Sequence, residues 1–318
     1  MRAAIFPGQG SQTVGMGKFL FDEFKLAQEI FEEASDSLSQ DMKKLCFDGP
    51  ESDLMLTENT QPAILLSSYV TYRVLADIAD LKISGSAGHS IGEYAAFVCS
   101  GAMAFSDGIK AVKTRGQEMQ KAVPAGKGGM AALMGATEAQ AKEVCAIALE
   151  KNPGGGTISP ANFNAPGQIV LSGSAEQVEF ASKNISADQL SEPPKRLKFI
   201  PLKVSAPFHC DLMQPAEAAM RTVIEGLELN APGYDIVQNF DGEAHSDTET
   251  LRENLIRQIS GPVLWVKCVE TLKASGHTKF IEFGNGKVLA GLLKKIDPSL
   301  EVLNINSIDD LKAVEASL

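Results

Sequence analysis

The stretch Gly88-His89-Ser90-Ile91-Gly92 decides how this sequence is interpreted. It follows a short apolar segment, residues 83–87, for which we predict a strand, and it precedes a helix-like segment, residues 93–99. A Gly-x-Ser-x-Gly turn between a strand and a helix raises the serine hydroxyl on a strained corner, and the new helix aims its N–H groups at the same place. The layout therefore predicts Ser90 as a nucleophile. The alternative is a purely structural turn.

The composition is that of an ordinary globular protein, with 318 residues of which 44% are hydrophobic and 22% are charged. The net charge of −11 argues against a nucleic-acid-binding protein. The first apolar run breaks at Pro7-Gly8, too early for a signal peptide, and no run is long enough to span a membrane. We therefore expect a cytoplasmic protein. Its five scattered cysteines predict reduced, buried thiols.

Strand and helix patterns alternate along nearly the whole chain, which predicts an α/β fold. Between the glycine-rich segment 125–129 and residue 204 the predicted order is β-α-β-β-α-β, the order of a ferredoxin-like unit. We predict one α/β body, formed by residues 1–125 and 203–318, and a small inserted domain of residues 126–202. A cleft between two such bodies is a common place for a ligand site.

The predicted elements follow from hydrophobic periodicity and from turn residues. The predicted strands are residues 2–6, 83–87, 130–134, 157–163, 168–171, 197–204, 235–238, 279–283 and 301–305. The predicted helices are residues 28–38, 61–78, 93–99, 107–123, 138–149, 175–185, 212–227, 249–259, 263–274, 287–296 and 309–316. We expect Thr60 to start the second of these helices, with Pro62 in its first turn.

A serine nucleophile needs a base, and the chain has four histidines. His209 follows the predicted strand 197–204 and a Pro-Phe step, and strand ends carry catalytic groups in α/β folds. The other three are less suitable. His89 lies inside the turn and is expected to point away from the hydroxyl, His245 lies in a polar loop, and His277 lies at a helix end. We therefore predict His209 as the base.

The imidazole needs an orienter, and the oxyanion formed during acyl transfer needs two N–H donors. No acid stands out as the orienter, because Asp211 is too close to His209 in the chain and the acids of the 241–247 loop are arbitrary choices. A backbone carbonyl can also accept the Nδ1–H, so both kinds of orienter stay open. One oxyanion donor should be the N–H of Ile91. The other could come from the glycine-rich loop 8–12, whose alternative interpretation is an ordinary turn.

Arg115 points to the kind of substrate. It lies at the edge of the apolar face of the predicted helix 107–123. That face consists of Ile109, Val112, Gly116, Met119 and Val123. A guanidinium beside a core face usually pairs with an anion, and arginine binds a carboxylate in a bidentate way. We therefore interpret Arg115 as a ligand for a substrate carboxylate. The alternatives are a structural salt bridge and a side chain whose head reaches water.

These features resemble the malonyl-CoA:acyl-carrier-protein transacylases, the acyltransferase family of fatty-acid and polyketide synthesis. The resemblance covers nearly the whole chain, in seven separated blocks and in the right order. The blocks are residues 8–12, 88–94, Arg115 with Gly116 and Met119, residues 161–164 with 166–168, Phe208-His209, Arg257-Gln258 with Pro262-Val263 and Trp265, and residues 284–289.

The resemblance implies an α/β-hydrolase-like body with a ferredoxin-like insert. It also implies a reaction in which malonyl-CoA and acyl carrier protein are the partners, an acyl-serine is the intermediate, and no cofactor or metal takes part. We expect a monomer. The implied site residues are Ser90 as acyl carrier, His209 as general base and acid, Gln9 and Ile91 as oxyanion-hole N–H donors, Arg115 as carboxylate ligand, Gln258 as the histidine orienter through its main-chain carbonyl, and Met119, Asn162 and Phe208 as pocket residues.

The chain departs from the family pattern at two positions. Ile91 replaces a common leucine, which matters little because only the N–H is needed. Phe208 stands where stand-alone bacterial members usually carry serine. In related synthase domains a phenylalanine before this histidine goes with malonyl rather than methylmalonyl, and its bulk would crowd an α-methyl group. The preceding Ala206-Pro207 does not match the synthase pattern fully.

Two rival functions are a serine esterase or thioesterase that uses water as acceptor, and a non-catalytic carrier-binding module. Arg115 argues against the first rival, because a hydrolase of neutral esters has no need for it. Carrier proteins are acidic, as this chain is, so docking predicts a local basic patch near the cleft. The candidates are Lys195, Arg196, Lys198 and Lys203, and their alternative interpretation is a solvated strand edge.

Overall fold

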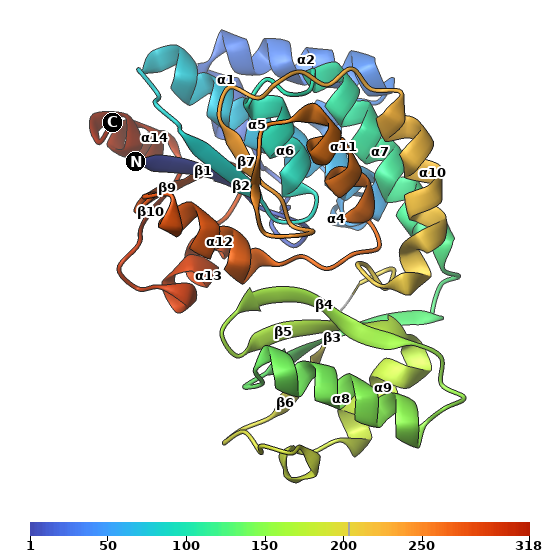
Figure 1. Ribbon diagram of the computed structural model, residues 1–318. Helices are drawn as coiled ribbons and strands as arrows, with labels where there is room; N and C mark the ends of the chain where they lie inside the picture. The colour runs from blue at the N-terminus through green and yellow to red at the C-terminus, as the bar shows by residue number, and fades with distance from the viewer. Residues whose placement is uncertain (203) are drawn as a thin grey trace.

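The computed structural model describes residues 1–202 and 204–318, and Lys203 lies outside the described residues. The strands form a six-stranded sheet and, below it in Figure 1, a four-stranded sheet. The larger sheet has the order β10-β9-β1-β2-β7-β8, parallel except for the β7–β8 pair. Its strands are β1 (Arg2–Phe6), β2 (Gly85–Gly88), β7 (Asp235–Val237), β8 (Ala244–His245), β9 (Lys279–Glu282) and β10 (Glu301–Asn304). The predicted α/β class is confirmed.

Strand β1 runs through the middle of the larger sheet and is buried on both faces. Ala4 and Phe6 belong to one hydrophobic cluster, and Ala3 and Ile5 belong to another. Successive side chains of a strand point to opposite faces, so both faces of the sheet are covered. A continuous apolar run suits a parallel strand that is covered in this way. The carboxyl ends of the parallel strands then share one edge, which is where open α/β sheets bind ligands.

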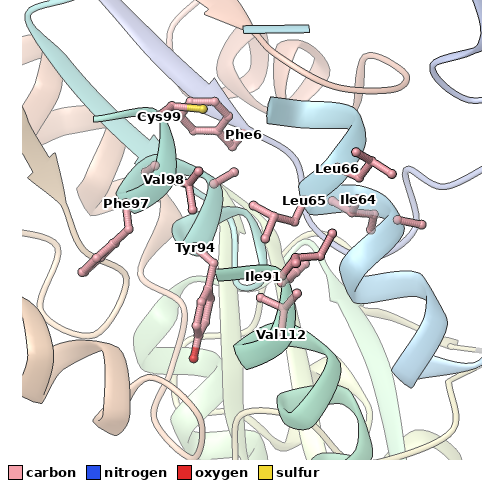
Figure 2. Close-up of a cluster of buried hydrophobic side chains, with 14 of the residues drawn as sticks. Phe6, Ile64, Leu65, Leu66, Ile91, Tyr94, Phe97, Val98, Cys99 and Val112 are labelled. Atoms are coloured by element: carbon pink, nitrogen blue, oxygen red, sulfur yellow. The ribbon is translucent and has the colours of Figure 1, made fainter. Parts of the chain in front are cut away.

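Helices cover the two faces of the larger sheet (Figure 1). They are α1 (Lys18–Glu23), α2 (Lys25–Leu38), α3 (Met42–Phe47), α4 (Glu51–Leu54), α5 (Thr57–Ile78), α6 (Gly92–Cys99), α7 (Phe105–Ala122), α10 (Gln214–Glu225), α11 (Thr248–Arg257), α12 (Trp265–Ala274), α13 (Val288–Ile296) and α14 (Ile308–Ala316). Every residue of α6 is buried. Figure 2 shows its side chains beside Leu65 of α5 and Val112 of α7. The helix that follows Ser90 is therefore held by packing on all sides.

The smaller sheet is antiparallel and has the order β4-β5-β3-β6. Its elements are β3 (Gly128–Met134), α8 (Glu138–Lys151), β4 (Ile158–Ala165), β5 (Gln168–Ser174), α9 (Ala175–Asn184), the 3₁₀ turn η1 (Ala187–Gln189) and β6 (Lys198–Pro201). Side chains of α8 and α9 form a separate hydrophobic cluster with this sheet. The order of strands and helices is the predicted β-α-β-β-α-β, and β6 is shorter than the predicted strand 197–204.

Some predicted boundaries were wrong. The helix expected to start at Thr60 begins at Thr57, and the Thr60 hydroxyl donates instead to the Leu54 carbonyl, 2.6 Å away. Pro62 consequently lies beyond the first turn. The residues from Thr57 to Gln61 are almost all buried, so tertiary packing extends the helix past the local start signal. The strand before Ser90 is shifted from residues 83–87 to Gly85–Gly88.

Short elements were missed altogether. No sequence pattern predicted the helices α1, α3 and α4, the strand β8 or the 3₁₀ turn η1, and the 3₁₀ turn η2 (Asp211–Met213) replaces the start of the predicted helix 212–227. Each spans six residues or fewer, which is too short for a clear periodic pattern. The expectation of buried, reduced thiols is confirmed, because all five cysteines are buried and free. Among the described residues, none of the helices combines the length and the apolar character that crossing a bilayer demands.

Candidate active site

Three loops meet at the carboxyl edge of the larger sheet because the strands before them are neighbours. Phe6 at the end of β1 pairs with Gly88 at the end of β2, and β2 also pairs with β7. Gln9 follows β1, Ser90 follows β2 and Asn239 follows β7. The serine therefore lies between the other two loops, at the edge where parallel sheets bind ligands.

Ser90 occupies a sharp corner in which its backbone is left-handed, with φ at 52°. The corner requires the glycines on either side. A Cβ on Gly88 would lie 2.0 Å from the carbonyl group of Gly92, and a Cβ on Gly92 would lie 2.2 Å from the Phe6 carbonyl oxygen. The His89 N–H donates to the same Phe6 oxygen at 2.9 Å. The predicted strand, sharp turn and helix are therefore present, and they leave the hydroxyl at the edge of the sheet.

His209 contacts the hydroxyl. Its Nε2 lies 2.7 Å from Ser90 Oγ, and its Nδ1 lies 2.9 Å from the carbonyl oxygen of Gln258 and 3.1 Å from that of Gly261. Carbonyl oxygens only accept, so Nδ1 carries the proton and Nε2 is free to accept from the hydroxyl. Burial and, after it, the positive charge of Arg115 lower the pKa of His209 from 6.5 to about 3. The imidazole is therefore neutral and able to act as a base.

The acids that the sequence left open as orienters have other partners. Asp241 Oδ2 lies 2.8 Å from Nε2 of His245, and Asp247 accepts the Thr250 N–H at the start of α11. His245 is half-buried rather than fully solvated. The geometry therefore favours the main-chain carbonyls as the groups that hold His209.

Arg115 is a buried cation whose hydrogen-bond acceptors are neutral. Its side chain is 1% exposed, and it donates to Gln61 Oε1 at 2.9 Å, to Gln258 Oε1 at 2.9 Å and to Ser90 Oγ at 3.3 Å. Its Nε is buried without a partner among the described residues. Burying a charge is costly unless it is paired with an opposite charge. This arrangement does not fit a structural salt bridge or a solvated head, and it leaves the guanidinium beside Ser90 Oγ without an anionic hydrogen-bond partner among the described residues.

The two N–H groups predicted for the oxyanion hole belong to the loops after β1 and β2. Within residues 1–202 and 204–318, the N–H groups of Gln9 and Ile91 donate to no other protein group. The N–H of Ser90 itself is occupied, because it donates to Asn239 Oδ1 at 2.7 Å. Two uncommitted donors at the cavity wall suit a developing oxyanion. Their role stays a prediction.

A cavity of about 170 Å³ lies in front of the serine. Residues of the larger body, of β3–β5 and of the chain between the two sheets line it, among them Met119, Asn162 and Phe208. Phe208 is 8% exposed and precedes the base, so its ring forms part of the apolar wall. Asn162 lies on β4. The next residue along this strand, Phe163, donates its N–H to the carbonyl oxygen of Val263 at 2.9 Å. All the predicted pocket residues are thus at one cavity.

Residues that sequence reasoning missed complete the surroundings. Gln61 holds one side of Arg115, and the side chain of Gln258 bridges Arg115 and the Ser90 carbonyl oxygen, to which its Nε2 donates at 2.9 Å. Nε2 of His89 donates to Oδ1 of Asn164 at 2.7 Å, so this imidazole bonds to β4 rather than to the Ser90 hydroxyl, although it also lines the cavity. No local signal marked Gln61, because it follows the polar run of residues 57–60.

The predicted basic patch lies on the smaller sheet. Lys195, Arg196 and Lys198 are exposed, and Lys198 begins β6, an edge strand. Lys203, the fourth candidate, lies outside the described residues. Leu202, which follows β6, lines the cavity. Lys198 lies at the opposite end of β6, where it pairs with Met134, so the patch lies farther from the cavity than Leu202 does. Its role in docking stays a prediction.

Comparisons with known proteins give a consistent family. The acyl transferase domain family matches residues 4–301. Malonyl CoA-acyl carrier protein transacylase from Haemophilus influenzae is 39% identical, with 99% of this chain and 98% of the relative covered, and that from Bacillus subtilis is 37% identical, with 99% and 96% covered. The structure of an acyl-carrier-protein S-malonyltransferase from Burkholderia pseudomallei has a TM-score of 0.91 and 41% identity, with 99% of both chains covered.

A further similar structure contains a partner. A malonyl-transacylase solved in complex with its type II PKS acyl-carrier protein has a TM-score of 0.93 and 37% identity to this chain, with 100% of this chain and 99% of that chain covered. The similarity therefore extends over the full length of both the sequence and the fold.

Proposed function

Since the chain belongs to the acyl transferase domain family, we propose that it is an enzyme that transfers a malonyl group from malonyl-CoA to acyl carrier protein. The relatives named above support the reaction. The observation that carries the choice of substrate is Arg115, a buried guanidinium 3.3 Å from Ser90 Oγ whose acceptors are all neutral. A malonyl group brings the carboxylate that this cation lacks, and a neutral acyl group does not.

The first half-reaction loads the enzyme. His209 Nε2 takes the hydroxyl proton of Ser90 while Oγ forms a bond to the thioester carbonyl carbon of malonyl-CoA. The N–H groups of Gln9 and Ile91 stabilise the resulting oxyanion. The C–S bond then breaks, and the CoA sulfur leaves with the proton from His209. Ser90 now carries the malonyl group as an ester, while the free carboxylate is bound by Arg115.

The second half-reaction reverses the first with another thiol. The pantetheine thiol of acyl carrier protein gives its proton to His209 and attacks the malonyl ester. The C–O bond breaks, and the proton returns to Ser90 Oγ. The bonds broken and formed are of similar energy, so the proposed reaction needs no cofactor, metal or ATP. His209 can act twice because it is neutral when each step begins.

The experiment that tests this proposal follows the acyl group by intact-protein mass spectrometry. The wild-type protein mixed with malonyl-CoA should gain the mass of one malonyl group, and Ser90→Ala should gain none. Added holo acyl carrier protein should then remove the group and gain it. A thioesterase would lose the group to water at the same rate with or without the carrier, and a non-catalytic module would gain no mass. Either outcome would contradict the proposal.

The finer architecture belongs to the same proposal. We infer an α/β-hydrolase-like body of residues 1–125 and 203–318 with a ferredoxin-like insert of residues 126–202. Support comes from the parallel sheet with a nucleophile at a strand-to-helix turn, and from the β4-β5-β3-β6 order of the antiparallel sheet. The five free, buried cysteines fit a reducing compartment such as the cytoplasm. The monomeric state stays a prediction.

A further inference from the structure

A buried carboxamide lies directly behind the nucleophile turn. Asn239 is 0% exposed. Its Oδ1 accepts the N–H of Ser90 at 2.7 Å, and its Nδ2 donates to the carbonyl of Gly88 at 2.7 Å. One side chain thus holds the last residue of β2 and the strained residue of the turn at once.

The contact between Asn239 and Ser90 holds a strained backbone conformation. The left-handed backbone of Ser90, φ 52°, is of a strained kind that persists only where the surroundings impose it. Both backbone polar groups of Ser90 are held by amide side chains, the N–H by Asn239 and the carbonyl by Gln258 Nε2 at 2.9 Å. The backbone conformation that aims Oγ at His209 is therefore fixed from behind. Neither Asn239 nor Gln258 lines the cavity in front of the serine.

Asn239 is in turn held by a buried acid. Its own backbone N–H donates to Oε2 of Glu93 at 2.7 Å, and Oε1 of Glu93 accepts from Gln238 Nε2 at 3.2 Å. Glu93 lies in the first turn of α6, three residues after the nucleophile, and is 0% exposed. Burial raises the pKa of Glu93 to about 7. The buried carboxyl group of Glu93 thus connects the loop after β7 to α6, the helix that follows Ser90.

We propose that Asn239 is a positioning residue for acyl transfer, whose carboxamide locks Ser90 in the conformation that presents Oγ to His209, and that Glu93 holds Asn239 in place. This inference rests on the proposed function only in naming the reaction. The two hydrogen bonds of the Asn239 side chain, which we call the lock, act on the serine turn itself, whichever acyl group arrives. Without it, Ser90 can relax towards an ordinary backbone conformation, and Oγ moves away from the base.

The test uses a neutral serine reagent, diisopropyl fluorophosphate, alongside malonyl transfer. In the reagent step Ser90 Oγ bonds to phosphorus, fluoride leaves and His209 takes the proton, so no malonyl group is needed. For Asn239→Ala we expect kcat for malonyl transfer and the reagent rate constant to fall by about 10²-fold, with an unchanged KM for malonyl-CoA, because a displaced reacting atom costs about that much. The matched control is Asn304→Ala, since Asn304 also donates to a buried glutamate, Glu282, but at the far edge of the sheet.

A second variant separates positioning from stability. Asn239→Asp keeps the acceptor for the Ser90 N–H, and the introduced carboxyl can donate to the Gly88 carbonyl only when it is protonated. The charged or titratable groups facing it are Glu93 from α6, Cys268 from α12, Asp241 next along its own loop, and Arg115 and His209 across the site. We expect its deficit relative to wild type to shrink as the pH falls from about 8 to about 6.

The outcomes of these experiments either support or overturn the positioning role of Asn239. The lock is supported if the two variants lose reagent reactivity as described while Asn304→Ala stays within about twofold of wild type. It is overturned if Asn239→Ala reacts with the reagent as fast as wild type, or if the deficit of Asn239→Asp is the same at both pH values. A wild-type protein that is not malonylated would refute the proposed function but would leave this comparison intact.

Discussion

At the residue scale, the chemistry depends on an imidazole kept neutral beside a cation. His209 lies between two main-chain carbonyls and the Ser90 hydroxyl, with the Arg115 charge nearby. The positive charge that we propose as the ligand of the substrate carboxylate also lowers the pKa of His209. A bound carboxylate cancels this charge, so the basicity of His209 should rise when substrate is present. We therefore propose that Arg115 links carboxylate binding to activation of the serine.

This link predicts a shift in pH dependence. In the free enzyme the pKa of His209 is lowered to about 3, so its reaction with diisopropyl fluorophosphate should not fall as the pH drops through 6.5. In Arg115→Met the charge is gone, the pKa of His209 should rise, and the acid limb of the reagent rate should move to higher pH. The measurement is the second-order rate constant against pH for both proteins. An acid limb near 6.5 in wild type, or an unmoved limb in the variant, would contradict the assignment.

At the element scale, the site depends on how closely β2, the turn and α6 approach β1. These contacts leave no room for a side chain at Gly92, whose Cβ would lie 2.2 Å from a backbone oxygen of β1. Backbone cannot give way as a flexible side chain can. The glycine pattern around Ser90 is therefore required by packing as well as by the chemistry.

Gly92→Ala should consequently destabilise the protein. We expect the free energy of unfolding to fall by about 1–3 kcal/mol, the usual cost of overpacking, or by more because the clash is with backbone. The matched control is Gly291→Ala on the exposed face of α13, where an added Cβ meets nothing within 4 Å. There alanine should stabilise the helix by about 0.5–1 kcal/mol. Denaturant titrations of both variants measure the difference, and equal stabilities would show that the turn tolerates a side chain.

The same elements show what could be predicted from sequence. Long helices with clear periodicity, such as α5 and α7, and the apolar strand β1 were predicted to within a few residues. The short helices before residue 55 were not, because their stability comes from tertiary packing rather than from a local pattern. Ser90 and His209 could be predicted because each residue type sits in a recognisable turn or strand-end context.

At the scale of the whole molecule, the contacts that complete the site join distant parts of the chain. Gln61 is 54 positions from Arg115, and Asn239 is 149 positions from Ser90. Nothing local marks such amides, because their partners are brought together only by the order of strands in the sheet. The sequence therefore predicted residues that the structure brings together, such as Ser90 and His209, and the structure was needed for the neutral acceptors of Arg115 and for the support behind Ser90.

The charge of the whole molecule also bears on carrier docking. The chain has a net charge of −11, so an acidic carrier should need the exposed basic residues Lys195, Arg196 and Lys198 of the smaller domain. Changing all three to glutamine should lower kcat/KM for the carrier by about tenfold at low salt, and should flatten its salt dependence. The control carries glutamine at Lys18, Lys25 and Lys82, exposed lysines with acidic partners in ion pairs. A similar loss in both triple variants would rule out a specific patch.

The most direct test compares two substrates on one variant. Arg115→Ala and wild type are assayed with malonyl-CoA and with acetyl-CoA, and Lys113→Ala on the same helix serves as control. If the buried guanidinium binds the malonyl carboxylate, kcat/KM should fall by about 10²–10³-fold for malonyl-CoA and by less than about tenfold for acetyl-CoA. Equal losses on both substrates would contradict the assignment.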